Sequence, residues 1–181
     1  MSHLKKFRAA LAEKGADAAI IGSKLNQKYL SDFDFDDGFV LVTKGQSYLI
    51  TDFRYVEAAT EQRNPELEVL MPNIGMLTCM EELLRENGCR KVMIEEETLS
   101  FADYGKYREK LTGMELCSGA SALLEELRLY KDEKELETMA RAQAVTDAAF
   151  AHILNFIKPE MTEIEVALEL SLIHISEPTR H

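Results

Sequence analysis

Residues 24–59 read KLNQKYLSDFDFDDGFVLVTKGQSYLITDFRYVEAA, and this stretch decides the fold. Residues 39–42 and 47–51 are two β-rich runs, and the link TKGQ between them is a hairpin signal. The acidic run that precedes the hairpin, residues 32–38, ends in glycine and predicts a loop. Residues 54–61, which follow it, read as a helix. The stretch therefore predicts a loop, a hairpin and a helix in that order.

The segments on either side of this stretch alternate between helix and strand. The first helix has Leu4, Phe7, Ala10 and Leu11 at helical spacing and stops at Gly15. The same patterns predict further elements, namely helices at residues 25–31, 76–86 and 101–111 and strands at 18–21, 67–70, 92–95 and 114–117. Such alternation with an early hairpin predicts an α/β fold, a mixed sheet covered by helices.

The character of the sequence changes after Leu129. Asp132 and Glu135 have the spacing of a capping box, which predicts a long helix to about residue 157. Thr162 and Glu165 begin another helix by the same spacing. The long helix is apolar over a wide arc and needs cover on more than one side. No later segment of the chain offers that cover, so we expect a truncated second domain. The apolar positions form two stripes: Leu136, Met139, Ala140, Phe150, Ile153, Leu154 and Ile157, and Ala142, Val145, Ala149 and Phe156.

The composition predicts an ordinary soluble globular protein that works in the cytoplasm. It is 46% hydrophobic and 29% charged, with a net charge of -11, which argues against nucleic acid or an anionic membrane as the main partner. No apolar run reaches the length of a membrane span, and the N-terminus lacks the pattern of a secretion signal. Cys79, Cys89 and Cys117 are odd in number and contain no CxxC motif, so they read as reduced thiols.

Several catalytic motifs are absent from the sequence. It contains no Gly-rich phosphate loop, no HExxH and no GxSxG. His152 has no carboxylate or cysteine at ligand spacing, which favours a packing or surface role. The acidic loop lacks the ligand ladder of an EF-hand, so we expect a solvated loop anchored by Phe33 and Phe35 rather than a calcium site. Residues 95–97, three consecutive glutamates, are expected to form a solvated turn.

Asp52 and Arg54 lie two residues apart where a strand meets a helix. In one interpretation Asp52 pairs with Arg54 or caps the helix. In the other, the planar guanidinium of Arg54 binds a carboxylate of a ligand. The sequence leaves both interpretations open.

Four segments in the right order resemble the creatinase/prolidase family. Residues 24–59 resemble the opening of its N-terminal domain, and residues 94–111 resemble a later strand and helix. Residues 123–150 resemble the junction with the catalytic domain, including Arg128, Lys131 and Glu135. Residues 157–170 resemble the start of the next helix, where Glu160 replaces a glycine that is usual in the family.

The resemblance implies a ribonuclease H-like N-terminal domain, followed here by the first helices of a truncated pita-bread domain. Family members are hydrolases, Xaa-Pro aminopeptidases and dipeptidases, whose catalytic domain binds two metal ions, usually manganese or cobalt, through two Asp, one His and two Glu. No residue of this sequence is assigned to that ligand set or to catalysis. The resemblance also implies a homodimer in which Asp36 and Arg54 reach a proline-containing peptide substrate in the other subunit.

The end of the chain, residues 170–181, resembles a translated sequencing adapter and is expected to be an artefact. We therefore predict an N-terminal domain at residues 1–127, catalytic-domain helices at 128–169, and a chain that is inactive by itself. One alternative is a non-catalytic binding module, which loss of the metal ligands from the full-length gene would indicate. Another is an independent small-molecule-binding α/β domain, against which the missing phosphate loop counts. The sequence does not separate aminopeptidase from dipeptidase.

Overall fold

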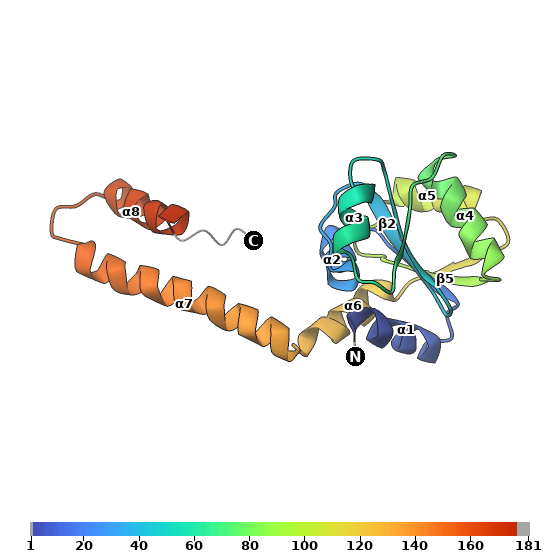
Figure 1. Cartoon of the computed structure of the whole chain (residues 1–181), viewed down its shortest axis with the longest axis horizontal. Coiled ribbons are helices and arrows are strands. Elements are labelled where there is room, and N and C mark those ends of the chain that lie inside the picture. The colour runs from blue at the N-terminus through green and yellow to red at the C-terminus, as the bar shows by residue number, and fades with distance from the viewer. Residues whose placement is uncertain (1, 177–181) are drawn as a thin grey trace. The chain divides into compact units, whose positions relative to one another are not determined.

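The chain folds into two compact units, residues 1–129 (the N-domain) and 130–181 (the helical segment). The computed structural model describes the backbone of residues 2–176 and the side chains of residues 2–171. The N-domain has helices on both faces of one sheet (Figure 1). Its helices are α1 (His3–Glu13), α2 (Lys24–Ser31), α3 (Val56–Gln62), α4 (Met76–Glu86), α5 (Phe101–Lys110) and α6 (Ala120–Leu129). Its strands are β1 (Ala18–Ile21), β2 (Gly38–Thr43), β3 (Ser47–Thr51), β4 (Glu68–Leu70), β5 (Lys91–Ile94) and β6 (Glu115–Cys117).

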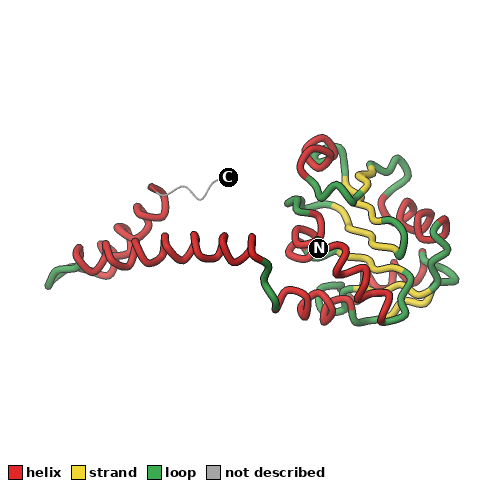
Figure 2. The backbone as a smooth tube through the Cα atoms, turned by 60° about the horizontal axis from the view of Figure 1, so that its bottom comes forward, coloured by secondary structure: helices red, strands yellow, loops and turns green. Residues whose placement is uncertain are grey.

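The six strands form one mixed sheet in the order β4-β3-β2-β1-β5-β6. Figure 2 draws the strands in yellow. Strands β1, β2 and β3 pair antiparallel, and the predicted hairpin aligns Phe39 with Ile50 and Val40 with Leu49. The remaining pairs, β1 with β5, β5 with β6 and β3 with β4, are parallel. The predicted mixed α/β class is therefore confirmed.

Side chains that alternate along β1 feed two separate cores. Ala19 and Ile21 face the core under α1, α2, α3 and α6, whereas Ala18 and Ile20 face the core under α4 and α5. This alternation follows from the two-residue period of a strand, and both faces are apolar because both are covered by helices. Within the N-domain, the sheet is thus a middle layer between two layers of helices.

Helix α6 is an element that the sequence analysis left unassigned. It begins directly after Gly119, and Leu123 and Leu124 are buried in the same core as α1. Its neighbour Leu127 packs against that core. Leu123 and Leu127 have helical spacing, so a periodicity signal was present before the change of character at Leu129.

The helical segment contains α7 (Glu133–Phe156) and α8 (Glu163–Ser176). The predicted capping box opens α7: the Asp132 carboxylate accepts from the Glu135 amide at 2.9 Å, and the Asp132 amide donates to the Glu135 carboxylate at 2.8 Å. Glu160 between the helices has a φ of 74°, the left-handed conformation that favours glycine. This conformation suits the glycine that the resemblance implies at this position. Of the expected artefactual tail, residues 170–176 continue α8, and residues 177–181 lie outside the described residues.

Among the described residues, the structure contains no helix that is both long enough and apolar enough to span a lipid bilayer.

Candidate functional site

The acidic loop between α2 and β2 is anchored by its aromatic residues. Asp32 ends α2 in the left-handed conformation, with a φ of 59°. Phe33 and Phe35 are then buried in the core, as the sequence analysis expected, and the side chains of Asp34 and Asp36 remain 48% and 63% exposed. The loop thus presents carboxylates on a backbone that apolar contacts hold in place.

The predicted site residue Asp36 pairs with α2. Its carboxylate lies 2.6 Å from the Lys24 ammonium and accepts a long hydrogen bond of 3.4 Å from the Tyr55 hydroxyl. The hydrogen bond from Lys24, followed by its charge, holds the pKa of Asp36 below its usual value. Asp36 is consequently an ionised, exposed carboxylate with an exposed lysine as its counterion.

The second predicted site residue, Arg54, lies between two carboxylates. Its Nη2 is 2.6 Å from Asp52 Oδ2 and also bonds Asp37, while its Nε donates to Asp52 Oδ2 at 3.0 Å. These hydrogen bonds, that from Asp52 first and that from Asp37 next, raise the pKa of Arg54. The Arg54 guanidinium also lies 5.4 Å from the centre of the Tyr55 ring.

The two predicted residues come together through Tyr55, which contacts both. Asp37 is a third member that the sequence analysis did not single out, although it lies in the acidic loop. The predicted pairing of Asp52 with Arg54 is present in the structure. It leaves Arg54 half exposed, and Nη1 makes no hydrogen bond among the described residues. The structure therefore shows the pairing without excluding a further ligand.

Glu95 contradicts the expectation of a solvated turn. The residue is 3% exposed, and its carboxylate accepts hydrogen bonds from the amides of Gly22 and Ser23 at 2.6 and 2.8 Å. The Ser23 hydroxyl and the Asn26 amide group donate to it as well, each at 2.6 Å. Four donors at the start of α2 thus replace water around this carboxylate.

Asn26 extends this network, because its side-chain oxygen accepts from Arg128 at 3.1 Å. Glu95 follows a buried strand directly, and Ser23 precedes a helix. Those two positions were a usable signal for an internal carboxylate at a helix N-terminus. The sequence analysis treated residues 95–97 as one solvated run. That interpretation suits Glu96 and Glu97, which are exposed, but not Glu95.

The three cysteines and His152 are the other candidate reactive side chains that the sequence analysis considered. Burial raises the pKa of Cys79, Cys89 and Cys117, so all three are protonated thiols at neutral pH. His152 of α7 lies 2.7 Å from the Glu169 carboxylate of α8 and stacks on Phe156. This surface pairing agrees with the role that the sequence analysis favoured.

Comparison with known proteins identifies the family to which the chain belongs. The profile of the creatinase/prolidase N-terminal domain matches residues 3–130. An uncharacterized peptidase, YqhT of Bacillus subtilis, is 30% identical over 167 residues, which cover 92% of this chain and 47% of that protein. The chain spans about half the length of the curated relatives that it matches.

Solved structures show the same likeness. The Xaa-Pro dipeptidase from Bacillus anthracis superposes with a TM-score of 0.88 at 32% identity, over 96% of this chain and 48% of that one. The aminopeptidase P from Streptococcus thermophilus gives a TM-score of 0.64 at 25% identity, over 69% of this chain and 94% of that one. Together with the matched domain, these likenesses show that the chain belongs to the family of Xaa-Pro peptidases that carry a creatinase/prolidase N-terminal domain.

Proposed function

We propose that the chain is the N-terminal part of an Xaa-Pro metallopeptidase, either an aminopeptidase or a dipeptidase. The observation that carries this proposal is the likeness to the Bacillus anthracis dipeptidase, which covers 96% of the chain and so includes the helical segment. A likeness confined to the N-domain would fit a protein that shares only that domain. The parent works as a homodimer in the cytoplasm, and its substrate is a proline-containing peptide.

The N-domain contributes a wall of the active site in the other subunit. Arg54 and Asp36 supply complementary charges for a peptide, because a guanidinium binds the terminal carboxylate and an acidic side chain binds the terminal amine. Both residues are at least half exposed. A substrate carboxylate binds at Nη1 of Arg54 or displaces Asp37, and a substrate amine displaces Lys24 from Asp36.

Arg54→Lys in the full-length parent tests this wall. Lysine keeps the positive charge but loses the fork that binds a carboxylate in two places. We expect KM to rise about tenfold, which corresponds to a lost charge-assisted hydrogen bond, with an unchanged melting temperature. A lowered melting temperature with normal kinetics would instead assign Arg54 to the start of α3 alone.

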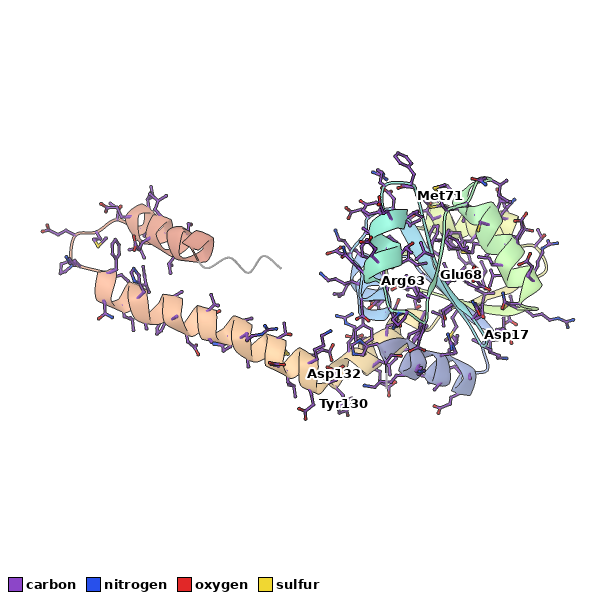
Figure 3. The ribbon with its side chains drawn as sticks, viewed as in Figure 1. Asp17, Arg63, Glu68, Met71, Tyr130 and Asp132 are labelled. Carbon is purple, nitrogen blue, oxygen red and sulfur yellow. The ribbon has the colours of Figure 1, made fainter. Side chains whose placement is uncertain are left out.

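Arg63 provides the matched control (Figure 3). Its guanidinium also makes hydrogen bonds, but to the backbone carbonyls of Thr60 and Leu67. Arg63→Lys should therefore lower the melting temperature and leave KM unchanged. A raised KM in Arg63→Lys together with an unchanged KM in Arg54→Lys would refute the assignment of Arg54 to substrate binding.

We further propose that the 181-residue chain does not hydrolyse Xaa-Pro bonds by itself. The family's two metal ions, manganese or cobalt, activate water for attack on the peptide carbonyl. No ligand for them is assigned in this chain, and the contact between His152 and Glu169 offers one imidazole and one carboxylate, fewer than two ions require. Incubation with an Xaa-Pro dipeptide and Mn²⁺ tests the point. Turnover that copurifies with the chain and is abolished by a chelator would refute it.

A further inference from the structure

A cavity of about 480 Å³ opens on the N-domain face that α4 and α5 cover. Its volume falls in the range of about 300–1,000 Å³ that is typical of small-molecule sites. Gly22 and Ser23, which follow β1, lie at its wall together with Glu95, which follows β5. The cavity therefore lies at the carboxyl ends of two adjacent parallel strands.

The connections that leave these two strands cross to opposite faces of the sheet. The segment after β1 leads into α2, whose Leu30 belongs to one core, and the segment after β5 leads into α5, whose Tyr107 belongs to the other. Such a switch point is where open α/β sheets form ligand-binding crevices, because the two diverging loops leave space between them.

Tyr107 brings to this cavity a hydroxyl that has no hydrogen-bond partner among the described residues. The residue is 5% exposed, and its ring packs edge-on against Phe39 with 6.3 Å between the ring centres. Its hydroxyl takes part in no hydrogen bond among the described residues. It is not one of the fully enclosed polar atoms, and because Tyr107 lines the cavity, a ligand bound there can accept a hydrogen bond from this hydroxyl.

The other polar groups of the wall are already satisfied by one another. Glu95 accepts from four donors, as described above. Asp103 accepts from the Ser100 hydroxyl at 2.7 Å and from the Lys106 ammonium at 2.6 Å. Among these polar side chains of the wall, the Tyr107 hydroxyl is therefore the one without a hydrogen-bond partner among the described residues.

The charges around the cavity decide what kind of partner suits Tyr107. Glu95 and Asp103 are two carboxylates against one ammonium, Lys106, so the site disfavours an anion. Both carboxylates already have partners, four donors at Glu95 and the Ser100 hydroxyl and Lys106 at Asp103, so neither is free to compensate the desolvation of a bound cation. Burial first, and then the charges of Asp103 and Glu95, raise the pKa of Tyr107. Its hydroxyl is therefore neutral at physiological pH and donates a hydrogen bond. The wall also includes the apolar residues Leu77, Ile94 and Leu99.

We propose that this cavity binds a small uncharged molecule with an apolar body and a carbonyl oxygen that accepts a hydrogen bond from Tyr107. The amide of an apolar carboxylic acid is the simplest such ligand. The proposal does not depend on peptidase activity, since the cavity lies entirely within the N-domain.

Three probes that share one apolar body test the ligand class. Phenylacetamide is neutral with a carbonyl, phenylacetate is an anion, and 2-phenylethylamine is a cation. Saturation-transfer NMR on the whole chain measures the binding of each. For a ligand of this size we expect phenylacetamide to bind with a Kd of about 1 mM, and the two charged probes to bind at least about fivefold more weakly. Equal binding of all three probes, tighter binding of either charged probe, or no phenylacetamide binding up to about 20 mM would overturn the proposal.

Tyr107→Phe identifies the site, because it removes only the hydroxyl. It should weaken phenylacetamide binding about fivefold, the effect of one lost neutral hydrogen bond, and preserve the melting temperature. Tyr104→Phe is the matched control on the same helix, at a residue outside the cavity wall. It should bind phenylacetamide as the parent does.

Leu77→Ala provides a second, independent test through the apolar wall. It should weaken all three probes by a similar factor of about threefold, because less apolar surface is buried on binding. Undiminished phenylacetamide binding in both Tyr107→Phe and Leu77→Ala would place the ligand elsewhere and refute the proposal.

Discussion

The N-domain and the helical segment differ in what covers their apolar side chains. The N-domain buries most of its large apolar residues in two cores, one on each face of the sheet, although a few such as Phe53 and Phe101 stay exposed. Of the described residues in α7, Ala149 and Ile153 are buried. The large hydrophobic residues that are exposed among the described residues of the same unit include Leu136, Met139, Phe150, Leu154, Ile157, Ile164 and Leu168. The N-domain is thus specified by tertiary packing, whereas α7 is specified mainly by its capping box and its local sequence.

The largest effect should come from Gly38, where the N-domain backbone is most crowded. Its φ is 146°, and a Cβ atom would lie 2.1 Å from the carbonyl oxygen of Ile50. Gly38→Ala should therefore destabilise the N-domain by about 3 kcal/mol or prevent its folding, through backbone strain and overpacking. Urea denaturation followed by circular dichroism measures the change.

Gly45 in the hairpin turn is the control, since no atom would lie within 4 Å of its added Cβ. Gly45→Ala should change the free energy of unfolding by less than about 1 kcal/mol. Equal costs at Gly38 and Gly45 would show that the close approach to Ile50 is relieved at little cost.

The next effect should come from the internal carboxylate of Glu95. Glu95→Gln keeps the size of the side chain, but it removes the charge and turns an NH₂ group toward hydrogen-bond donors. The free energy of unfolding should fall by about 2 kcal/mol in the same urea experiment. Glu97→Gln, at the exposed end of the same run, should cost less than about 0.5 kcal/mol. If Glu95→Gln left the free energy of unfolding unchanged, the four donors would be equally well satisfied by water.

Asp17 should make the stability of the N-domain depend on pH. The Lys44 side chain and the backbone amides of Lys91 and Arg90 lower its pKa from 3.8 to about 2. A lowered folded-state pKa stabilises the fold above pH 3.8, and this contribution, about 1–2 kcal/mol, is lost as the pH falls from about 4 to 2. Asp17→Asn should remove it and flatten the stability profile in that window.

Asp147 of α7 is the counterpart of Asp17 in the helical segment, where its carboxylate accepts from Gln143 at 2.8 Å. Asp147→Asn should change the free energy of unfolding by less than about 0.5 kcal/mol. If Asp147→Asn flattened the dependence of stability on pH as strongly as Asp17→Asn does, the two units would not differ in this respect.

The smallest effect on unfolding, and the largest on association, should come from α7. Phe150 and Leu154 are 63% and 60% exposed, and exposed apolar surface of this kind favours self-association. The whole chain should self-associate in sedimentation experiments, and a chain ending at residue 129 should be monomeric. Phe150→Gln with Leu154→Gln should shift the whole chain toward the monomer without destabilising the N-domain. Phe53→Gln, which removes a single exposed aromatic side chain of the N-domain, should leave association unchanged. A monomeric whole chain would mean that the apolar residues of α7 find cover.

Local patterns in the sequence predicted the hairpin, the two capping boxes and most helices and strands. The strand order was not predictable in this way, because the pairing of β1 with β5 joins segments that are far apart in the chain. The sequence also placed Asp52 beside Arg54, since both lie on one short turn. It missed Asp37 and Glu95, because their partners are set by how the loops meet in three dimensions.

The pairing of β1 with β5 also constrains the order in which the N-domain folds. Strands β2 and β3 form a hairpin from segments that are close in the sequence. The pairing of β1 with β5 instead aligns Ala18 with Val92, two residues far apart in the chain. Closing so long a loop is slow compared with forming a hairpin. During synthesis, until β5 has been made, β1 therefore lacks a partner on the side that β5 occupies in the folded domain. The partly built sheet stays open to other strands until β5 leaves the ribosome.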